Sequence, residues 1–237
     1  MLIFHHDHIS STSTEALRLL NEGKTKIPFA VTAKKQSAGR GQRSRSWQSP
    51  EGNIYLSIGC EVSKELLRLV PLMTACILCE WMCEKLSQRP QIKWPNDLLI
   101  NGKKIAGILC ESSWSAEDNI RVVIGIGVNV NLSPQLITSD YESACMSNYL
   151  VKKESVESLT LSFLEFWDQV KFQNRKEILN VFESYHIPRG HLWCHKDNPE
   201  IKLSYEGISD EGHLLLRDLI TGQIHEMMST QHSFRLC

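Results

Sequence analysis

The dipeptide Asn101-Gly102 constrains the fold of this chain more than any other short feature. It separates two β-rich runs, residues 98–100 and 104–111. Asparagine followed by glycine readily takes the positive φ angles of a type I′ turn, so the pattern predicts a tight hairpin. A third β-rich run, residues 120–130, follows a short connection at 113–119. The centre of the chain is therefore predicted to be a mostly antiparallel sheet, with helices from both sides of the sequence packed on it.

Other β and helical patterns complete a prediction of the α+β class. Short strands are expected at residues 2–5, 29–32, 53–62 and 92–94, and helices at 66–86, 155–171 and 176–185. A further helix begins at a capping box, residues 12–15, and stops at Gly23. Pro71 lies near the first turns of the longest helix or bends it. After residues 187–190, short strand patterns with turn signals predict a small β-barrel. We therefore expect two domains, residues 1–187 and 188–237.

Composition narrows the class of protein. The chain of 237 residues has a net charge of −1 and 42% apolar residues, which supports a buried core and argues against a broad nucleic-acid-binding face. It contains no run of about 18 apolar residues, so we expect no transmembrane helix, and its first residues lack the pattern of a signal peptide. Cys76, Cys79 and Cys83 share one face of a helical pattern, where cysteine acts as a small hydrophobe. This favours reduced thiols and a cytoplasmic location over disulfides or a zinc site.

Residues 37–47 concentrate three arginines, two glycines and Trp47 with almost no apolar content. Arginine binds phosphate or carboxylate bidentately, and glycine lets backbone N–H groups approach an anion. The segment predicts a loop that closes over a nucleotide or another anionic group. A solvated basic loop or an RNA-contacting tail fits the composition equally well.

The segment from Lys93 to Asp97 places polar side chains at the end of a predicted strand. Pro95 restricts the backbone after Trp94, so Asn96 and Asp97 leave the strand in a defined direction. A carboxylate at that position is a candidate Mg²⁺ ligand. Pro-Asn-Asp is also common turn chemistry, which is the simpler interpretation of the segment alone.

Two lysines follow the predicted hairpin turn, and strand alternation sends them to opposite faces of the sheet. On simple alternation Lys104 shares its face with Ala106 and Ile108, whereas Lys103 shares its face with Ile105 and Gly107. A lysine on the inner face needs an anion to offset its burial. The alternative is that both lysines protect a sheet edge against aggregation.

The run from Gly125 to Asn131 alternates glycine and asparagine with apolar residues. Glycine weakens a strand and often marks where a ligand or another backbone comes close; a bulge is the plainer explanation. Asn129 and Asn131 would share a side of the strand. The run lacks the spacing of a dinucleotide-binding fingerprint, and no Walker loop occurs in the chain.

The order of these motifs resembles the biotin protein ligase family. A Ser-Thr helix start is followed by Gln-x-x-Gly-Arg-Gly-x-x-x-Arg-x-Trp, Lys-Trp-Pro-Asn-Asp, Lys-x-Ala-Gly-Ile-Leu-x-Glu and Gly-x-Gly-x-Asn. The resemblance covers residues 2–131 with specific motifs and continues more loosely beyond. It implies a class II synthetase-like catalytic domain and a C-terminal SH3-like barrel, in the form without an N-terminal DNA-binding domain.

The same resemblance implies an activity and its substrates. An ATP-dependent ligase of this family forms biotinyl-5′-AMP and pyrophosphate from biotin and ATP with Mg²⁺. It then transfers biotin to a lysine of the biotin carboxyl carrier domain of a carboxylase. Neither a nucleic acid nor a membrane is an expected partner, and a homodimer is possible because exposed strand edges can pair.

The resemblance also assigns roles to individual residues. Lys104 and Arg40 are the expected catalytic residues, and Asp97 is the expected Mg²⁺ ligand. The expected biotin-binding residues are Ser11, Thr12, Ser13, Gln36, Arg40, Gly41, Gln42, Lys104, Ala106 and Gly107. The expected ATP-binding residues are Arg43, Arg45, Trp47, Asn96, Asp97, Asn129 and Arg235.

This chain departs from the family pattern at three positions. Gln42 stands where the family usually has arginine, and Ser44 stands where it often has glycine. Ser13 stands where the helix start usually has asparagine. The loss of the arginine would loosen retention of the adenylate unless Arg43 substitutes for it. Two other functions remain open: a biotin-binding module that has lost catalysis, and a lipoate-type acyl ligase. A nucleic-acid binder is a more distant alternative.

Overall fold

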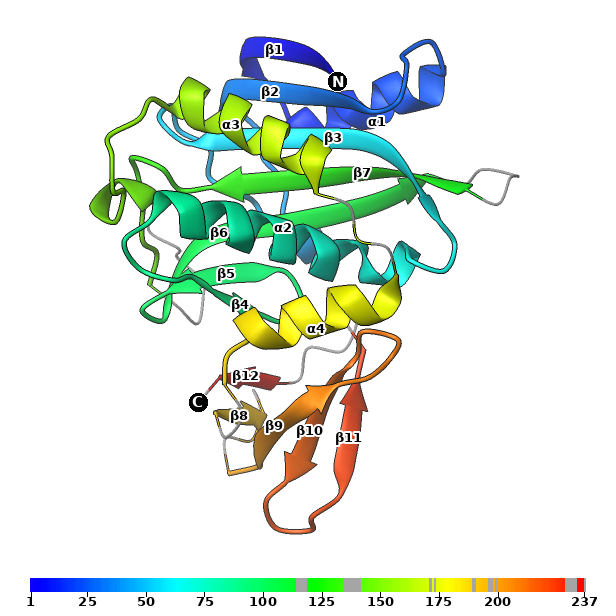
Figure 1. The fold of residues 1–237 in the computed structure, drawn as a ribbon, viewed down its shortest axis with the longest axis vertical. Helices are drawn as coiled ribbons and strands as arrows, with labels where there is room; N and C mark the ends of the chain where they lie inside the picture. Colours follow the sequence, from blue (N-terminus) through cyan, green and yellow to red (C-terminus); the bar gives the residue numbers. More distant parts are fainter. Residues whose placement is uncertain are drawn as a thin grey trace.

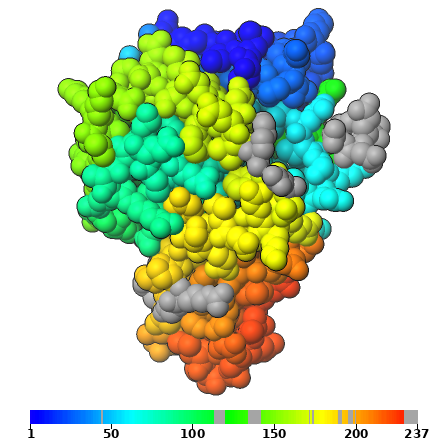
Figure 2. All heavy atoms as spheres, in the orientation of Figure 1, coloured from blue at the N-terminus to red at the C-terminus, as the bar shows by residue number. Residues whose placement is uncertain are grey.

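In the part of the chain that it describes, the computed structural model contains two β-sheets and four α-helices (Figure 1). It describes residues 1–113, 119–133, 142–170, 172, 174–188, 191–195, 198, 200–228 and 234–236. The larger sheet has seven strands in the order β1-β2-β3-β7-β6-β5-β4, and the smaller has five in the order β11-β10-β9-β8-β12. Figure 2 shows the smaller sheet as the narrow end of the molecule.

The larger sheet is mixed, and its pairings are antiparallel except between β1 and β2. The predicted mostly antiparallel sheet is therefore confirmed. The turn at Asn101-Gly102 has positive φ at both residues, as the predicted hairpin requires. The strands are β1 (Leu2–Ile9), β2 (Phe29–Gln36), β3 (Ile54–Ser63), β4 (Gln91–Lys93), β5 (Asp97–Ile100), β6 (Lys103–Ser113) and β7 (Asn119–Val128).

The four α-helices begin and end close to the predicted positions. Helix α1 (Thr12–Glu22) ends at Gly23, which takes the left-handed conformation, but its N-cap is Ser11 and not Thr12. Pro71 lies in the first turn of α2 (Val70–Lys85), where a missing N–H costs nothing. The others are α3 (Val156–Gln169) and α4 (Arg175–Tyr185), with short 3₁₀ turns η1 (Gln42–Ser44), η2 (Leu67–Leu69) and η3 (Met146–Asn148).

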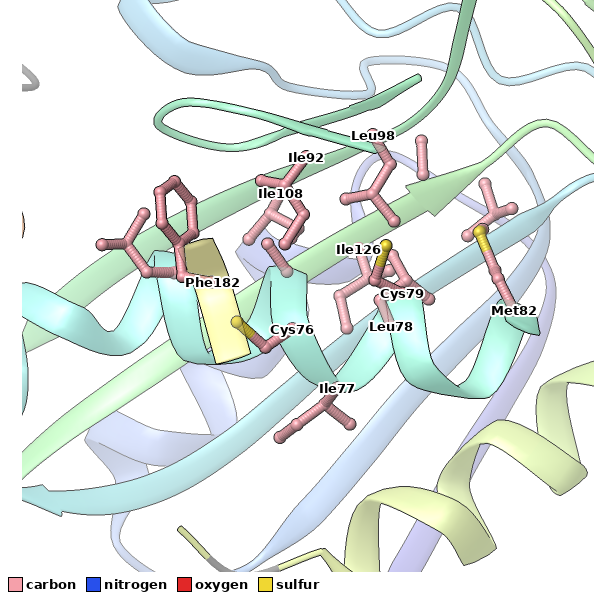
Figure 3. Packing of buried hydrophobic residues seen from close by; sticks show 14 of the residues in the cluster. Cys76, Ile77, Leu78, Cys79, Met82, Ile92, Leu98, Ile108, Ile126 and Phe182 are labelled. Carbon is pink, nitrogen blue, oxygen red and sulfur yellow. The ribbon is translucent and has the colours of Figure 1, made fainter. Parts of the chain in front are cut away.

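Helices α1 and α2 lie on opposite faces of the larger sheet. Val123 packs in a cluster with α1, whereas its neighbour Ile124 packs with α2, and successive strand residues point to opposite faces. Figure 3 shows Cys76 and Cys79 of α2 among the buried side chains of the α2 face. Cys83 is exposed, so the predicted cysteine face is buried only in part.

The smaller sheet is antiparallel and packs against the larger unit. Its strands are β8 (Leu192–His195), β9 (Lys202–Ile208), β10 (Leu214–Asp218), β11 (Ile224–Met227) and β12 (Phe234–Leu236). Leu203 and Leu216 join the same buried cluster as α2, and the Trp94 indole donates a hydrogen bond to the Gly212 carbonyl at 3.0 Å. The division into domains at 187/188 stays a prediction. Within the described part of the chain, no helix has the length and apolarity to cross a membrane.

Candidate active site

A bulge in β6 decides where the Lys104 side chain lies. The pairing with β5 shifts between Leu98 and Leu99, so that Lys104 pairs with Leu99 while Ala106 pairs with Leu98. One extra residue on β6 is therefore accommodated at this point, and simple alternation fails across it. The prediction that Lys104 shares a face with Ala106 and Ile108 is wrong.

Lys104 instead lies on the face of Gly107. A Cβ atom at Gly107 would lie 3.4 Å from the Lys104 Nζ atom. The Nζ atom is 2.5 Å from Oδ1 of Asp97, and both side chains are 17% exposed. Lys103 points elsewhere, exposed and paired with Glu142 at 2.7 Å. Lys104 is thus the half-buried member of the lysine pair, and Asp97 supplies the negative charge that offsets its burial.

Two asparagines hold the backbone around this lysine. The Asn96 amide donates to the Ile108 carbonyl at 2.7 Å, and Asn129 donates to the carbonyls of Ala144 and Lys104 at 3.2 and 3.4 Å. Asn129 is nearly fully buried, whereas Asn131 follows the end of β7 and is exposed. Both asparagines lie beyond the end of β7, and the shared side of a strand stays a prediction. Both amides that were predicted to contact the adenylate are occupied in positioning β6.

Gly107 and Gly127 pair across β6 and β7 and form a flat floor beside Lys104. The Trp47 indole lies on this floor: a Cβ at Gly127 would be 2.6 Å from two indole atoms, and one at Gly107 would be 3.0 Å from a third. The Lys104 Nζ atom is 5.3 Å from the indole centroid. The Trp47 Nε1 atom is buried and makes no hydrogen bond to the described residues. The two glycines thus leave the space that the aromatic ring occupies directly on the strands.

A chain of buried hydroxyl and amide groups lies at the other end of the floor. Ser13, Thr12 and Gln36, which the sequence singled out, are connected to Ser57 and Ser49, which it did not. Ser57 lies between Leu56 and Ile58 in the buried first half of β3, and a small polar residue between these apolar neighbours is the signal that could have found it. Ser11 is also buried, but its hydroxyl accepts from Thr14 N as the cap of α1.

Residues 37–47, which we call the arginine-rich loop, fold back on themselves above the site. Gly41 N–H donates to the Arg45 carbonyl at 2.8 Å, and Arg40 forms an isolated bridge with Ser46. The Arg40 guanidinium contacts Glu111 of β6 at 2.6 Å. Arg43 takes a left-handed conformation with φ of 59°, which is uncommon for a residue with a side chain. Burial and the neighbouring Arg45 lower the pKa of Arg43.

Three other predicted residues are placed as follows. Gln42 opens the 3₁₀ turn η1, and Ala106 is buried with its side chain in the α2 cluster. Arg235 pairs through its backbone with Cys194, and its side chain lies outside the described residues, as does the side chain of Ser44.

Three groups of residues follow one another in space along one face of the sheet. They are a hydrogen-bonded series of hydroxyl and amide groups, which we call the hydroxyl and amide chain, a flat glycine floor, and the ammonium–carboxylate pair of Lys104 and Asp97. Such an arrangement suits an elongated ligand that has a polar ring system at one end and an anion at the other. Within the described ranges, no group of three or more His, Cys, Asp or Glu side chains converges as a metal site. A single carboxylate such as that of Asp97 is enough for a Mg²⁺ ion whose other ligands are mainly phosphate oxygens and water, as is common for this ion.

Comparison with known proteins agrees with this site. Residues 6–129 match the sequence model of the Biotin/lipoate A/B protein ligase family. The Bifunctional ligase/repressor BirA of Bacillus subtilis is 32% identical over 225 residues, covering 90% of this chain and 69% of that protein. The Biotin–[acetyl-CoA-carboxylase] ligase of Paracoccus denitrificans is 31% identical over 219 residues, covering 87% and 90%.

A solved structure is similar over the whole chain. The biotin protein ligase from Aquifex aeolicus in complex with biotin and ATP has a TM-score of 0.76 and 27% identity, covering 100% of this chain and 99% of that one. The chain belongs to the biotin/lipoate A/B protein ligase family. Within that family, the relative from Paracoccus denitrificans and the solved protein from Aquifex aeolicus are biotin ligases by name.

Proposed function

We propose that this chain is a biotin protein ligase, which activates biotin with ATP and transfers it to a lysine of a biotin carboxyl carrier domain. One observation carries the proposal: the hydroxyl and amide chain, the glycine floor and Lys104 follow one another on a single face of the sheet. Their order matches the order of the ureido ring, the apolar ring and the carboxylate of biotin.

The ureido group of biotin needs both hydrogen-bond donors and acceptors. Thr12, Gln36 and Ser57 supply hydroxyl and amide groups that can act as either. Thr12 and Ser57 are buried and Gln36 is half-buried, so their hydrogen bonds to a ligand would form with reduced competition from water. The apolar ring of biotin would lie over Gly107 and Gly127 after Trp47 leaves the floor.

Lys104 acts in the first half-reaction. Its ammonium group holds the biotin carboxylate while one carboxylate oxygen attacks the α-phosphorus of ATP. The bond from that phosphorus to the bridging oxygen breaks, and pyrophosphate leaves. Negative charge grows on the phosphoryl oxygens, which is where a preorganised cation is most effective. Asp97 keeps Lys104 at the site before the ligand arrives.

The arginine-rich loop supplies the remaining positive charge. Arg40 would exchange Glu111 for the carboxylate or phosphate of the ligand, and Arg45 and Arg43 lie on the same loop. Asp97 would hold the Mg²⁺ ion that accompanies ATP, and this ion supplies further charge neutralisation at the phosphates. In the second half-reaction the acceptor amine attacks the biotinyl carbonyl carbon, and AMP leaves as the carbon–oxygen bond breaks.

The test is transfer of labelled biotin to a carrier domain, with and without ATP. We expect ATP-dependent labelling of one lysine and biotin-dependent release of pyrophosphate. Parallel reactions with lipoate address the lipoate-type alternative, because a lipoate ligase would release pyrophosphate with lipoate. Binding of biotin with neither pyrophosphate release nor transfer would identify a binding module and refute the proposal.

Two further features belong to the proposal. The chain would work in the cytoplasm, which the free thiols of the described cysteines support. It would also form a homodimer through the edge strand β1, where Leu2 and Ile3 are exposed. Sedimentation at micromolar concentration tests the second feature, and a monomer at all concentrations would exclude it.

A further inference from the structure

The hydroxyl and amide chain has a single direction of hydrogen-bond donation. The Thr12 backbone N–H donates to Gln36 Oε1 at 2.8 Å, which identifies that atom as the amide oxygen. The Thr12 hydroxyl must therefore donate to it as well, at 3.1 Å. Because a hydroxyl has one hydrogen, Ser57 must donate to Thr12 at 2.9 Å, and Ser13 must donate to Ser57 at 3.0 Å.

Donation continues beyond Gln36 to the arginine-rich loop. With its oxygen facing Thr12, the Gln36 amide presents its Nε2 atom to the Ser49 hydroxyl at 2.8 Å. Ser49 in turn donates its hydrogen to the Trp47 carbonyl at 2.9 Å. Ser49 thus connects a side chain of the ureido end of the site to the backbone of the residue that covers the glycine floor.

Tight packing makes this connection rigid. Ser49 is 6% exposed, and a Cβ atom at Gly39 would overlap the Trp47 carbonyl and lie 2.5 Å from the Ser49 Oγ atom. Backbone bonds from Trp47 N to the Gly39 carbonyl and from Gln36 N to the Ser49 carbonyl enclose the same group. Gln36 is half-buried, whereas Ser49 is buried, so a rotation of the Gln36 amide breaks its bond to Ser49 and thereby disturbs the bond from Ser49 to the Trp47 carbonyl.

We propose that Ser49 is a positioning residue that couples occupancy of the ureido site to the position of Trp47, and hence to nucleotide binding. The inference rests on the proposed function. A ureido group that bonds to Thr12 and Gln36 turns the Gln36 amide away from Ser49. Ser49 then no longer holds the Trp47 carbonyl in a fixed position, and the Trp47 indole is released from the glycine floor. Release of the indole frees the space beside Lys104, 5.3 Å from the ring centroid, for the reacting groups.

The experiment measures this coupling by calorimetry on the full chain. α,β-Methylene ATP with Mg²⁺, which cannot be cleaved at the reacting phosphate, is titrated with and without saturating biotin. The ratio of the two dissociation constants is the coupling factor, expected at about tenfold in the wild type. In Ser49→Ala we expect a factor below about twofold, because loss of one hydrogen bond in the connection separates the two sites.

Ser57→Ala is the matched control. It removes a hydroxyl of the same chain on the side away from Trp47, so biotin binding should weaken about two- to tenfold while the coupling factor stays at its wild-type value. Ser49→Thr keeps the hydroxyl and should keep the coupling. If Ser49→Ala does not fold by circular dichroism, Ser49→Cys, with a similar volume and a weak donor, takes its place and should show a reduced factor.

An unchanged coupling factor in Ser49→Ala, or an equal loss in Ser57→Ala, would overturn the role of Ser49. A wild type that binds biotin and the nucleotide independently would overturn it too. Failure of the proposed function has a different signature, because the wild type would then bind no biotin in the first titration, and the inference would fall with it.

Discussion

A methyl group added to the glycine floor should separate the binding of biotin from the stability of the fold. In Gly127→Ala the new Cβ would lie 2.6 Å from two atoms of the Trp47 indole. That is about 1 Å closer than the ~3.5 Å at which carbon contacts become favourable. Trp47 is only partly buried and lies on a loop, so the indole can lift from the floor.

The expected changes in stability and in biotin affinity depend on whether the group that lies over Gly127 can move. Without ligand, lifting the indole is inexpensive and alanine is favoured over glycine within a strand, so the free energy of unfolding should change by less than about 1 kcal/mol. A bound biotin cannot lift, because it is held at the hydroxyl chain and at Lys104. Overpacking a fixed contact costs about 1–3 kcal/mol, which corresponds to roughly 5- to 150-fold weaker binding.

Isothermal titration with biotin and urea denaturation would measure the two quantities. Gly59→Ala is the control, because its Cβ would overlap the ring of fully buried Phe29 and would not contact Trp47. It should lower the free energy of unfolding by about 1–3 kcal/mol and leave biotin affinity within about twofold of wild type. Wild-type biotin affinity in Gly127→Ala would refute the assignment of the glycine floor to the ligand.

Three further predictions concern catalysis, adenylate retention and pH. Lys104→Ala should slow biotin-dependent pyrophosphate release by about 100-fold or more with an unchanged circular dichroism spectrum, and a near-normal rate would exclude its role. Gln42→Arg should slow the escape of biotinyl-5′-AMP into solution, and an unchanged rate would mean that Arg43 or the backbone already retains it. Burial lowers the pKa of His186 to about 3, so this side chain stays neutral in the native state while the unfolded chain takes up a proton below pH 6.5. The contribution of neutral His186 to the free energy of unfolding is complete above pH 6.5. The free energy of unfolding, measured by urea denaturation, should therefore fall by about 1–2 kcal/mol between pH 7 and pH 5, and His186→Phe should make this fall smaller.

Local sequence patterns predicted the secondary structure around the larger sheet well. Asn101-Gly102 forms the hairpin turn, Gly23 ends α1, and Pro71 lies in the first turn of α2. Each of these effects depends on the φ angle or the N–H group of the residue itself, so the neighbouring sequence is enough to predict it. The order of the motifs was enough to identify the family.

What only the tertiary structure decided is which side chains meet. The bulge beside Leu98 turns Lys104 to the face of Gly107, and no local pattern records a shift of register between two strands. Ser49 enters the series of hydroxyl and amide groups because the loop after η1 meets β2, and Ser57 enters it because β3 meets α1. Propensity acts within a few residues, whereas register and packing depend on partners that the chain meets only when it is folded.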